Sequence, residues 1–147
     1  MFRGNLPAKI DEQGRIKIPS AHRQILDMNY GEQVYVTSVT GYNVLIYPMH
    51  EWEDMEAKLL EPPKLLPGKL KFLRNTSYYG QVGKVDRQSR ILIPVRLREA
   101  AEIDAREVDV MGQLNYLEIW NRERFQEVLK KDPYTEVDAL ALAEIGI

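Results

Sequence analysis

The sequence predicts an α+β fold in which two copies of one unit close a single small β-barrel, related by an approximate twofold axis and carrying peripheral helices. The main observation is an internal repeat. Residues 11–19 read Asp-Glu-Gln-Gly-Arg-Ile-Lys-Ile-Pro, and residues 86–94 read Asp-Arg-Gln-Ser-Arg-Ile-Leu-Ile-Pro. Six of these nine positions are identical, at an offset of 75 residues from 11 to 86. A repeat on this scale sets the architecture, because each copy buries its apolar face against its neighbour.

The size of the repeated unit is the second observation. Each copy offers about four short strands and little helix, which is too small to bury a stable core alone. Two copies packed together remove the exposed strand edges that either would leave. We therefore expect a first repeat over residues 5–52, a connector over 53–79, a second repeat over 80–124 and a C-terminal helical tail over 125–147.

The first repeat is expected to begin with two short strands around a turn. Asp11 is a good first residue for that turn, and Gly14 can take positive φ. Pro19 fits the first turn of a helix. The β-branched and aromatic segments that follow favour a hairpin, and Trp52 then leads a helical pattern. The expected elements are strands at 2–5 and 16–18, a helix at 19–28, strands at 33–39 and 43–47, and a helix at 51–60.

The second repeat is expected to follow the same order, with Asp86 and Pro94 in the places of Asp11 and Pro19. A short helix within 64–75 joins the two repeats. Strands at 78–85 and 91–93, a helix at 95–101, and strands at 108–111 and 114–120 then follow. In the tail, a helix at 122–130 is expected to turn Phe125, Val128 and Leu129 inward. After Pro133, residues 137–145 are expected either to form a short terminal helix or to fray.

Charge is distributed very unevenly for a chain whose net charge is only −2. Net charge is +3 over residues 1–23, −6 over 24–63, +8 over 64–98 and −7 over 99–147. Positive charge therefore collects around both motif copies. A basic face on an acidic protein is typical of nucleic-acid binding that the overall charge conceals, and ordinary scatter of solvated charges is the alternative.

Most catalytic and metal chemistry finds no support in the sequence. The chain has no Cys, which excludes disulfides, thiolate metal sites and a cysteine nucleophile and suits a reducing cytosol. His22 and His50 lie in different elements, and the segment 80–83 lacks the residues of a phosphate-binding loop. A carboxylate pair of Asp11 and Asp86 is conceivable, but a turn-capping role is simpler. We expect no enzyme activity, cofactor, metal site, membrane span or secretory signal.

The motif arginines leave two roles open. Arg15 and Arg90 are suited to pair with the motif aspartates or to point outward to phosphates, because a guanidinium binds planar anions in bidentate fashion in both cases. Other cations near the motifs alternate with apolar positions, as expected of a solvated strand face: Lys9, Lys17, Lys84 and Arg87.

The chain resembles the MraZ family of bacterial transcriptional regulators, which are built from two tandem SpoVT/AbrB-type domains. The doubled Asp-x-x-x-Arg at Asp11/Arg15 and Asp86/Arg90, each before an apolar-x-apolar-Pro run, carries the resemblance. The start Met-Phe-Arg-Gly and the segments 110–114 and 118–120 are also similar to the family, and the likeness covers nearly the full length.

This resemblance implies a fold in which the two repeats interlock their hairpins within one chain. It also implies a ring-shaped homo-oligomer, commonly an octamer, in the cytoplasm and at the nucleoid. Such proteins bind double-stranded DNA at direct repeats upstream of the cell-division and cell-wall gene cluster, usually as repressors. Arg15 and Arg23 match basic positions that AbrB-type domains use on DNA. Ala8 and Gly83 stand where such domains often carry another basic residue, and Ser89 replaces a glycine, so the two surfaces need not be equivalent.

The expected DNA-binding residues are Arg3, Lys9, Arg15, Lys17, Arg23, Lys84, Arg87 and Arg90, and the expected structural residues of the motif are Asp11, Gly14, Pro19, Asp86 and Pro94. The alternative function is a protein-binding module of antitoxin-like type on the same fold. In that case the acidic C-terminal helices are the candidate surface.

Overall fold

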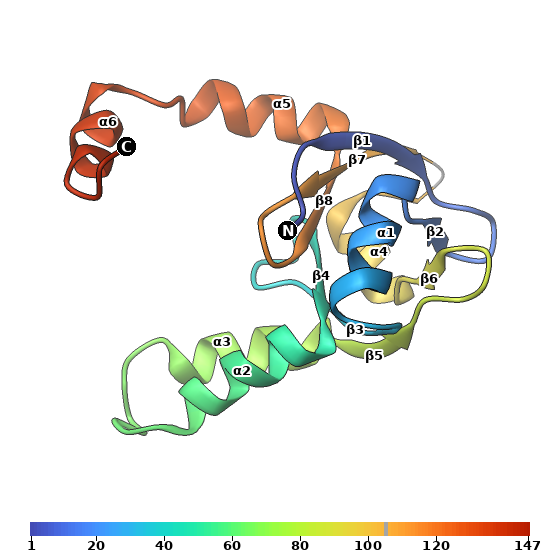
Figure 1. Ribbon diagram of the computed structural model, residues 1–147, viewed down its shortest axis with the longest axis horizontal. Helices are drawn as coiled ribbons and strands as arrows, with labels where there is room; N and C mark the ends of the chain where they lie inside the picture. The colour runs from blue at the N-terminus through green and yellow to red at the C-terminus, as the bar shows by residue number, and fades with distance from the viewer. Residues whose placement is uncertain (105) are drawn as a thin grey trace.

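The structure is a computed structural model that describes residues 1–104 and 106–147, and it is a mixed α+β fold, as predicted (Figure 1). The first half contains β1 (Asn5–Lys9), β2 (Arg15–Lys17), α1 (Ser20–Asn29), β3 (Gln33–Thr37), β4 (Val44–Pro48) and α2 (Met49–Leu60). The second half contains α3 (Lys69–Tyr78), β5 (Gln81–Lys84), β6 (Arg90–Leu92), α4 (Val95–Ala101), β7 (Glu107–Gly112), β8 (Leu117–Asn121), α5 (Arg122–Lys131) and α6 (Glu136–Ala143).

The first strand differs most from the sequence prediction. A strand was expected at residues 2–5, but β1 begins at Asn5, and Phe2 forms only an isolated bridge with Leu114. Pro7 lies in the middle of β1, which is possible because β1 is an edge strand and need not donate a hydrogen bond on its open side. Pro19 was expected in the first turn of α1 but is its N-cap residue, whereas α4 begins at Val95, directly after Pro94, as expected.

Six strands form one antiparallel sheet in the order β1-β7-β8-β4-β3-β5, and β2 pairs separately with β6. The pairing crosses between the halves, because β1 pairs with β7 and β5 pairs with β3. The central pair, β4 with β8, also joins the two halves. The predicted closed barrel is wrong: β1 and β5 remain at opposite edges of the sheet, because β2 and β6 pair with each other and do not bridge those edges.

Alternating residues of the strands place apolar side chains on both faces of the sheet. In β4, Val44 and Ile46 belong to the main core, whereas Leu45 and Tyr47 belong to a second cluster. The main core is aliphatic and fills the space between the sheet, α1, α4 and the β2–β6 pair. Its largest fully buried side chains include Phe2, Ile16, Ile18, Leu26, Ile46, Ile91, Ile93, Leu97, Ile103, Leu117 and Ile119.

The second cluster is aromatic and anchors α2 and α3. Trp52 of α2 stacks on Tyr35 with ring centroids 4.6 Å apart, and Phe72 of α3 lies 6.3 Å from Trp52. Tyr47 stacks on Tyr116 at 4.6 Å, and burial raises the pKa of Tyr47 to about 12. Figure 1 shows α2 and α3 projecting from the sheet as one arm, and α5 with α6 as another.

The tail also differs from prediction. Phe125 packs against Trp120 at 5.2 Å, but Leu129 is exposed and α5 has no buried residue. The expected inward face of α5 is therefore wrong for Val128 and Leu129. None of the helices in residues 1–104 and 106–147 is long and apolar enough to cross a membrane.

Candidate nucleic-acid interface

The Asp11 carboxylate holds the first motif turn together. Its Oδ1 accepts hydrogen bonds from the main-chain N–H groups of Gln13 and Arg15, both at 2.9 Å, and its Oδ2 accepts one from Nε of Arg15 at 3.1 Å. Gly14 has φ of +81°, a conformation that favours glycine. The donors stabilise the charged carboxylate, so the pKa of Asp11 lies below its ordinary value, chiefly because of the main-chain N–H of Arg15.

The second motif turn repeats this geometry. Oδ1 of Asp86 accepts from the N–H groups of Gln88 and Arg90 at 2.8 Å, and Oδ2 accepts from Nε of Arg90 at 2.9 Å. The main-chain N–H of Arg90 is again the chief reason that the pKa of this carboxyl is lowered. Ser89 takes the place of Gly14 with φ of +63°, so the serine adopts the same left-handed conformation. Each aspartate thus caps its own turn.

Between the two turns, β2 and β6 form a two-stranded ribbon with one face buried and one face open. Ile16 pairs with Ile91, and both side chains are fully buried. On the opposite face, Arg15 pairs with Leu92, and Lys17 pairs directly with Arg90. Like charges directly opposite in a ribbon destabilise it. The Asp86 carboxylate, 2.9 Å from Nε of Arg90, offsets part of this repulsion.

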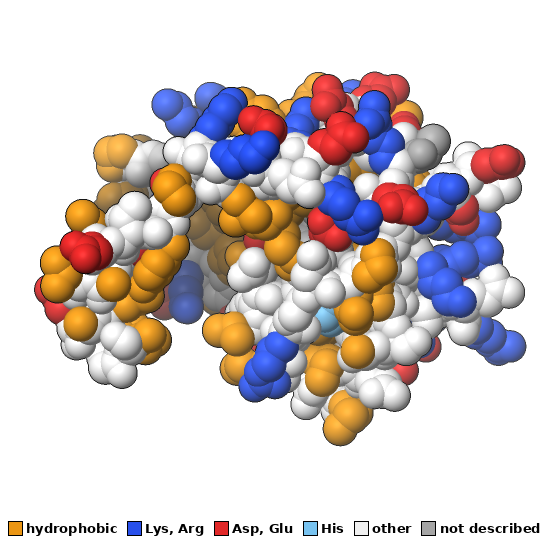
Figure 2. Space-filling model, turned by 90° about the horizontal axis from the view of Figure 1, so that it is seen from above, with side chains coloured by type: hydrophobic (Ala, Val, Ile, Leu, Met, Phe, Trp, Pro, Cys, Tyr) orange, Lys and Arg blue, Asp and Glu red, His pale blue; other side chains and the backbone are white. Residues whose placement is uncertain are grey.

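The ribbon is fixed to the turns by main-chain hydrogen bonds. The N–H of Ile18 donates to the carbonyl of Ser89 at 2.7 Å, and the N–H of Ile93 donates to the carbonyl of Gly14 at 3.0 Å. The end of β2 is therefore hydrogen-bonded to the second motif turn, and the end of β6 to the first. The two turns and the ribbon form one rigid end of the molecule, where Lys and Arg side chains gather at the right of Figure 2.

A shallow hollow of similar size lies beside each turn. The first, about 460 Å³, is lined by Lys9, Ile10, Asp11 and Glu12. The second, about 490 Å³, is lined by Glu32, Lys84, Val85, Asp86 and Arg87. Matched positions line both, but Glu12 in the first corresponds to Arg87 in the second. The lining side chains accordingly have a net charge of −1 in the first hollow and 0 in the second, where Lys84 lies 3.5 Å from the Glu32 carboxylate.

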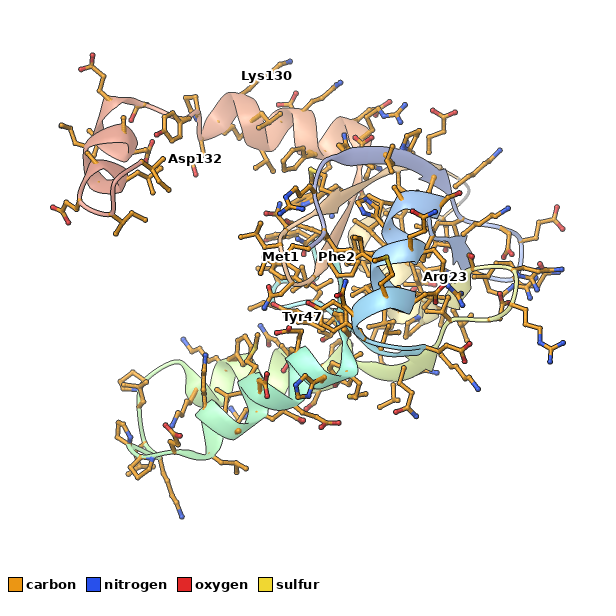
Figure 3. All side chains as sticks on the ribbon, in the orientation of Figure 1. Met1, Phe2, Arg23, Tyr47, Lys130 and Asp132 are labelled. Atoms are coloured by element: carbon orange, nitrogen blue, oxygen red, sulfur yellow. The ribbon has the colours of Figure 1, made fainter. Side chains whose placement is uncertain are left out.

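Arg23 has a different position from the other predicted cations. Its side chain is only 16% exposed, and its Nη1 donates to the main-chain carbonyl of Asp86 at 2.8 Å. Its Nε donates to Asp27 at 2.9 Å. Figure 3 shows Arg23 between α1 and the ribbon end of the molecule. These contacts give Arg23 a positioning role for the second turn.

Arg98 of α4 takes the corresponding place beside the first turn, and we did not predict it as a site residue. Its Nε donates to Asp104 at 2.7 Å, and its Nη1 donates to the carbonyl of Ile93. A Cβ added to Gly14 would overlap the Arg98 guanidinium, so glycine at this position leaves room for that side chain. The match between Arg23 and Arg98 in the repeat is the sequence signal that points to it.

The structure brings seven of the eight predicted cations to the ribbon end and leaves one apart. Lys9, Arg15, Lys17, Arg23, Lys84, Arg87 and Arg90 lie on the ribbon, on the two turns, or on the elements that contact them. Arg3 precedes β1, whereas Lys9 ends it, and five residues of strand extend over about 17 Å. Arg3 is therefore separated from the group by the length of β1.

The described residues contain no cluster of three or more metal-ligating side chains. His22 is buried and lies 3.3 Å from the carbonyl of Val110, whereas His50 is exposed on α2. The two carboxylates that might have formed a catalytic pair are each engaged by their own turn.

Comparison with known proteins shows the family of the chain. The family model described as "MraZ protein, putative antitoxin-like" matches residues 1–74 and 81–143. Proteins named transcriptional regulator MraZ are 44% identical in Acidobacterium capsulatum and 46% identical in Koribacter versatilis, each over the full length of both chains. A protein of the same name in Pseudoalteromonas atlantica is 34% identical over 95% of this chain and 91% of its own. The chain belongs to the MraZ family.

Proposed function

We propose that this protein is a transcriptional regulator that binds double-stranded DNA through the β2–β6 ribbon and the two motif turns. The observation that carries the proposal is the open face of the ribbon, where Lys17 lies directly opposite Arg90 and beside Arg15. A two-stranded ribbon fits the major groove of B-form DNA. Its arginines are suited to phosphates or to guanine edges, and the lysines and arginine of the turns to flanking phosphates.

The arrangement of the halves supports a pseudo-twofold relation between the repeats at 5–52 and 80–124. β1 and β5 exchange places between the halves, and β2 pairs with its own counterpart β6. In this proposal the connector 53–79 and the tail 125–147 flank the symmetric unit. The pair of turns then offers two similar contacts to DNA that differ in charge through Glu12 and Arg87.

The family supports a finer proposal about target and assembly. The protein acts as a repressor at direct repeats upstream of the cell-division and cell-wall gene cluster, at the nucleoid, with no catalytic step of its own. It does so as a ring of subunits, such as an octamer. A ring suits direct repeats because several weak contacts, tethered in one assembly, bind with a high effective concentration.

A salt titration of DNA binding tests the proposal. Fluorescence anisotropy is measured with a labelled duplex from the region upstream of that gene cluster, and with a scrambled duplex of equal length as control. Each neutralised phosphate contributes a slope of about −0.9 to log K against log salt, so several subunits should give a slope of several units. A flat response between low and physiological salt, or equal affinity for the scrambled duplex, would count against sequence-specific binding at this interface.

The antitoxin-like alternative has one observation in its favour, the exposed apolar side chains of the tail, such as Val137 and Leu140. A module of that type binds another protein through such a surface. The same titration separates the two functions. A purified chain that remains monomeric and does not bind the duplex would favour protein binding over DNA binding.

A further inference from the structure

The C-terminal segment, residues 132–147, is apolar and has no buried residue. Helix α6 contains Val137, Leu140 and Leu142, and Ile145 and Ile147 follow it. Leu140 is 72% exposed and Ile147 79% exposed. A capping box between Thr135 and Asp138 defines the start of the helix. An isolated helix of eight residues is nevertheless marginal in water and needs a packing partner to remain formed.

The hairpin of α2 and α3, residues 49–78, is the second surface with exposed apolar side chains. Its base is anchored to the sheet through Trp52 and Phe72, but its far end is open. Leu65, in the loop between the helices, is 95% exposed. Other exposed leucines are Leu66 in the same loop, Leu60 at the end of α2, and Leu70 and Leu73 on α3. Patches of this kind mark protein–protein contacts.

The C-terminal segment and one side of the hairpin, the loop and α3 of residues 64–78, have opposite charge. Residues 132–147 contain four acidic side chains and no Lys or Arg: Asp132, Glu136, Asp138 and Glu144. Residues 64–78 contain four basic side chains and no Asp or Glu: Lys64, Lys69, Lys71 and Arg74. Residues 49–63, which include α2, have a net charge of −4, so the hairpin as a whole is neutral and its positive charge of +4 lies on the loop and α3. The negatively charged C-terminal segment therefore matches the α3 side of the hairpin and not the α2 side. Complementary charge of this kind selects a partner and fixes its orientation.

We propose that the C-terminal segment of one chain docks on the α2–α3 hairpin of a second copy. Figures 1 and 2 show the segment as an arm that stands apart from the sheet, with hydrophobic side chains over its surface. The contact joins two different surfaces, so it is heterologous. Contacts of that type build a closed ring when the rotation between subunits closes. The proposal rests on the ring assembly proposed above and names the surfaces that form it.

The absence of cysteine from the sequence allows a direct test by cross-linking. A tagged Leu140→Cys chain is co-expressed with an untagged chain that carries Leu66→Cys, Leu70→Cys or Leu73→Cys. A short bismaleimide is added, and the tagged products are separated on a denaturing gel. We expect a cross-linked heterodimer with at least one of the three partners. The matched control partner is Met28→Cys, which is 79% exposed on α1 and outside both surfaces, and we expect no heterodimer with it.

Light scattering of the parent chain separates failure of this inference from failure of the ring proposal. A monomeric parent would overturn both. An oligomeric parent without the heterodimer, or with equal cross-linking to Met28→Cys, would overturn the docking alone. A chain carrying both Leu140→Cys and Leu70→Cys that cross-links only within itself would place the segment on its own hairpin and would also overturn docking between copies.

Charge reversal provides a second, independent measurement. Lys71→Glu with Arg74→Glu should reduce the oligomer mass, Glu136→Lys with Glu144→Lys should do the same, and the combination should restore it. Restoration is the result that a merely destabilised hairpin would not give. If Lys71→Glu with Arg74→Glu instead lowers DNA affinity while the oligomer mass stays unchanged, these two cations bind DNA and the docking proposal is wrong.

Discussion

The guanidinium of Arg23 donates a hydrogen bond of 2.8 Å to the main-chain carbonyl of Asp86, 63 residues further along the chain. The bond joins helix α1 of the first half to the motif turn of the second. Arg98 has the corresponding position at the first turn, where its guanidinium lies beside Gly14 and donates a hydrogen bond to the carbonyl of Ile93. Each motif turn, with its exposed Lys and Arg side chains, is therefore held in place by a mostly buried arginine, Arg98 at the first turn and Arg23 at the second.

Arg23→Ala should lower stability and reduce DNA binding only as a consequence. A hydrogen bond to a charged group contributes about 1.5–3 kcal/mol, and the Arg23 side chain is mostly buried. For a domain of this size the melting temperature should fall by about 3–12 °C, measured by circular dichroism. The exposed Arg87 supplies the matched control. Arg87→Ala should leave the melting temperature unchanged and weaken DNA binding, and the opposite pattern would reverse these two roles.

Arg15→Ala should weaken operator binding by about 10–150-fold per contact, the equivalent of about 1.5–3 kcal/mol, while the turn survives. The reason is that Asp11 is held mainly by the main-chain N–H groups of Gln13 and Arg15, which the substitution leaves in place. The ion pair itself is partly exposed and of the kind worth about 0–1 kcal/mol.

Melting temperature, oligomer mass and DNA affinity should be measured on the same sample of this variant. A lower melting temperature or a smaller oligomer mass would show that Arg15 stabilises the turn. A variant that is intact and still binds as tightly as the parent would remove Arg15 from the interface.

Glu12→Arg should strengthen DNA binding. Glu12 stands in the first hollow where Arg87 stands in the second, so the substitution gives the first turn the same cation as the second. If the first turn contacts DNA, the salt slope should steepen by about 0.9 for each added phosphate contact, and Glu12→Gln should give an intermediate affinity. An unchanged affinity and slope would mean that only the second turn approaches DNA.

Stability should decrease as the pH falls below about 6.5 because of His22. Burial lowers the pKa of this histidine, opposed by its hydrogen bond to Val110. Since the folded pKa lies below the unfolded value, the unfolded chain binds more protons between the two values, and acidification favours unfolding there. The slope for one proton is at most about 1.4 kcal/mol per pH unit.

Urea unfolding at pH 5, 6 and 7 measures the slope. His22→Gln should flatten it in that range. His50→Gln, which changes an exposed histidine on α2, should leave it as in the parent. Equal slopes in the parent and the His22 variant would assign the pH dependence to other groups.

The motif turns could be predicted from sequence because their bonds are local. Asp11 and Arg15 are four residues apart, and turn chemistry alone places a carboxylate beside the following N–H groups. The helices at 20–29 and 95–101 follow from apolar spacing after a proline in the same way. The internal repeat then predicted that Asp86 and Arg90 take the places of Asp11 and Arg15 in the second turn.

The structure differs from the sequence prediction where the position of an element or side chain depends on residues far away in the sequence. The position of β1 was obscured by Pro7, which an edge strand tolerates and a central strand does not. A guanidinium suits a carbonyl as well as a phosphate, so the sequence did not show that Arg23 lies inward. The apolar spacing of Val128 and Leu129 in α5 predicted burial, but no element of the described chain covers them.

The exchange of β1 and β5 between the halves has a consequence for synthesis on the ribosome. The partner of β1 is β7, which begins at Glu107, about 100 residues later. Translation at about 5–20 residues per second leaves the first strand unpaired for roughly 5–20 s. During that interval the nascent first half has an open strand edge and an incomplete core. Native packing must therefore await the second half, and a chain truncated between the repeats should be a substrate for chaperones and proteases.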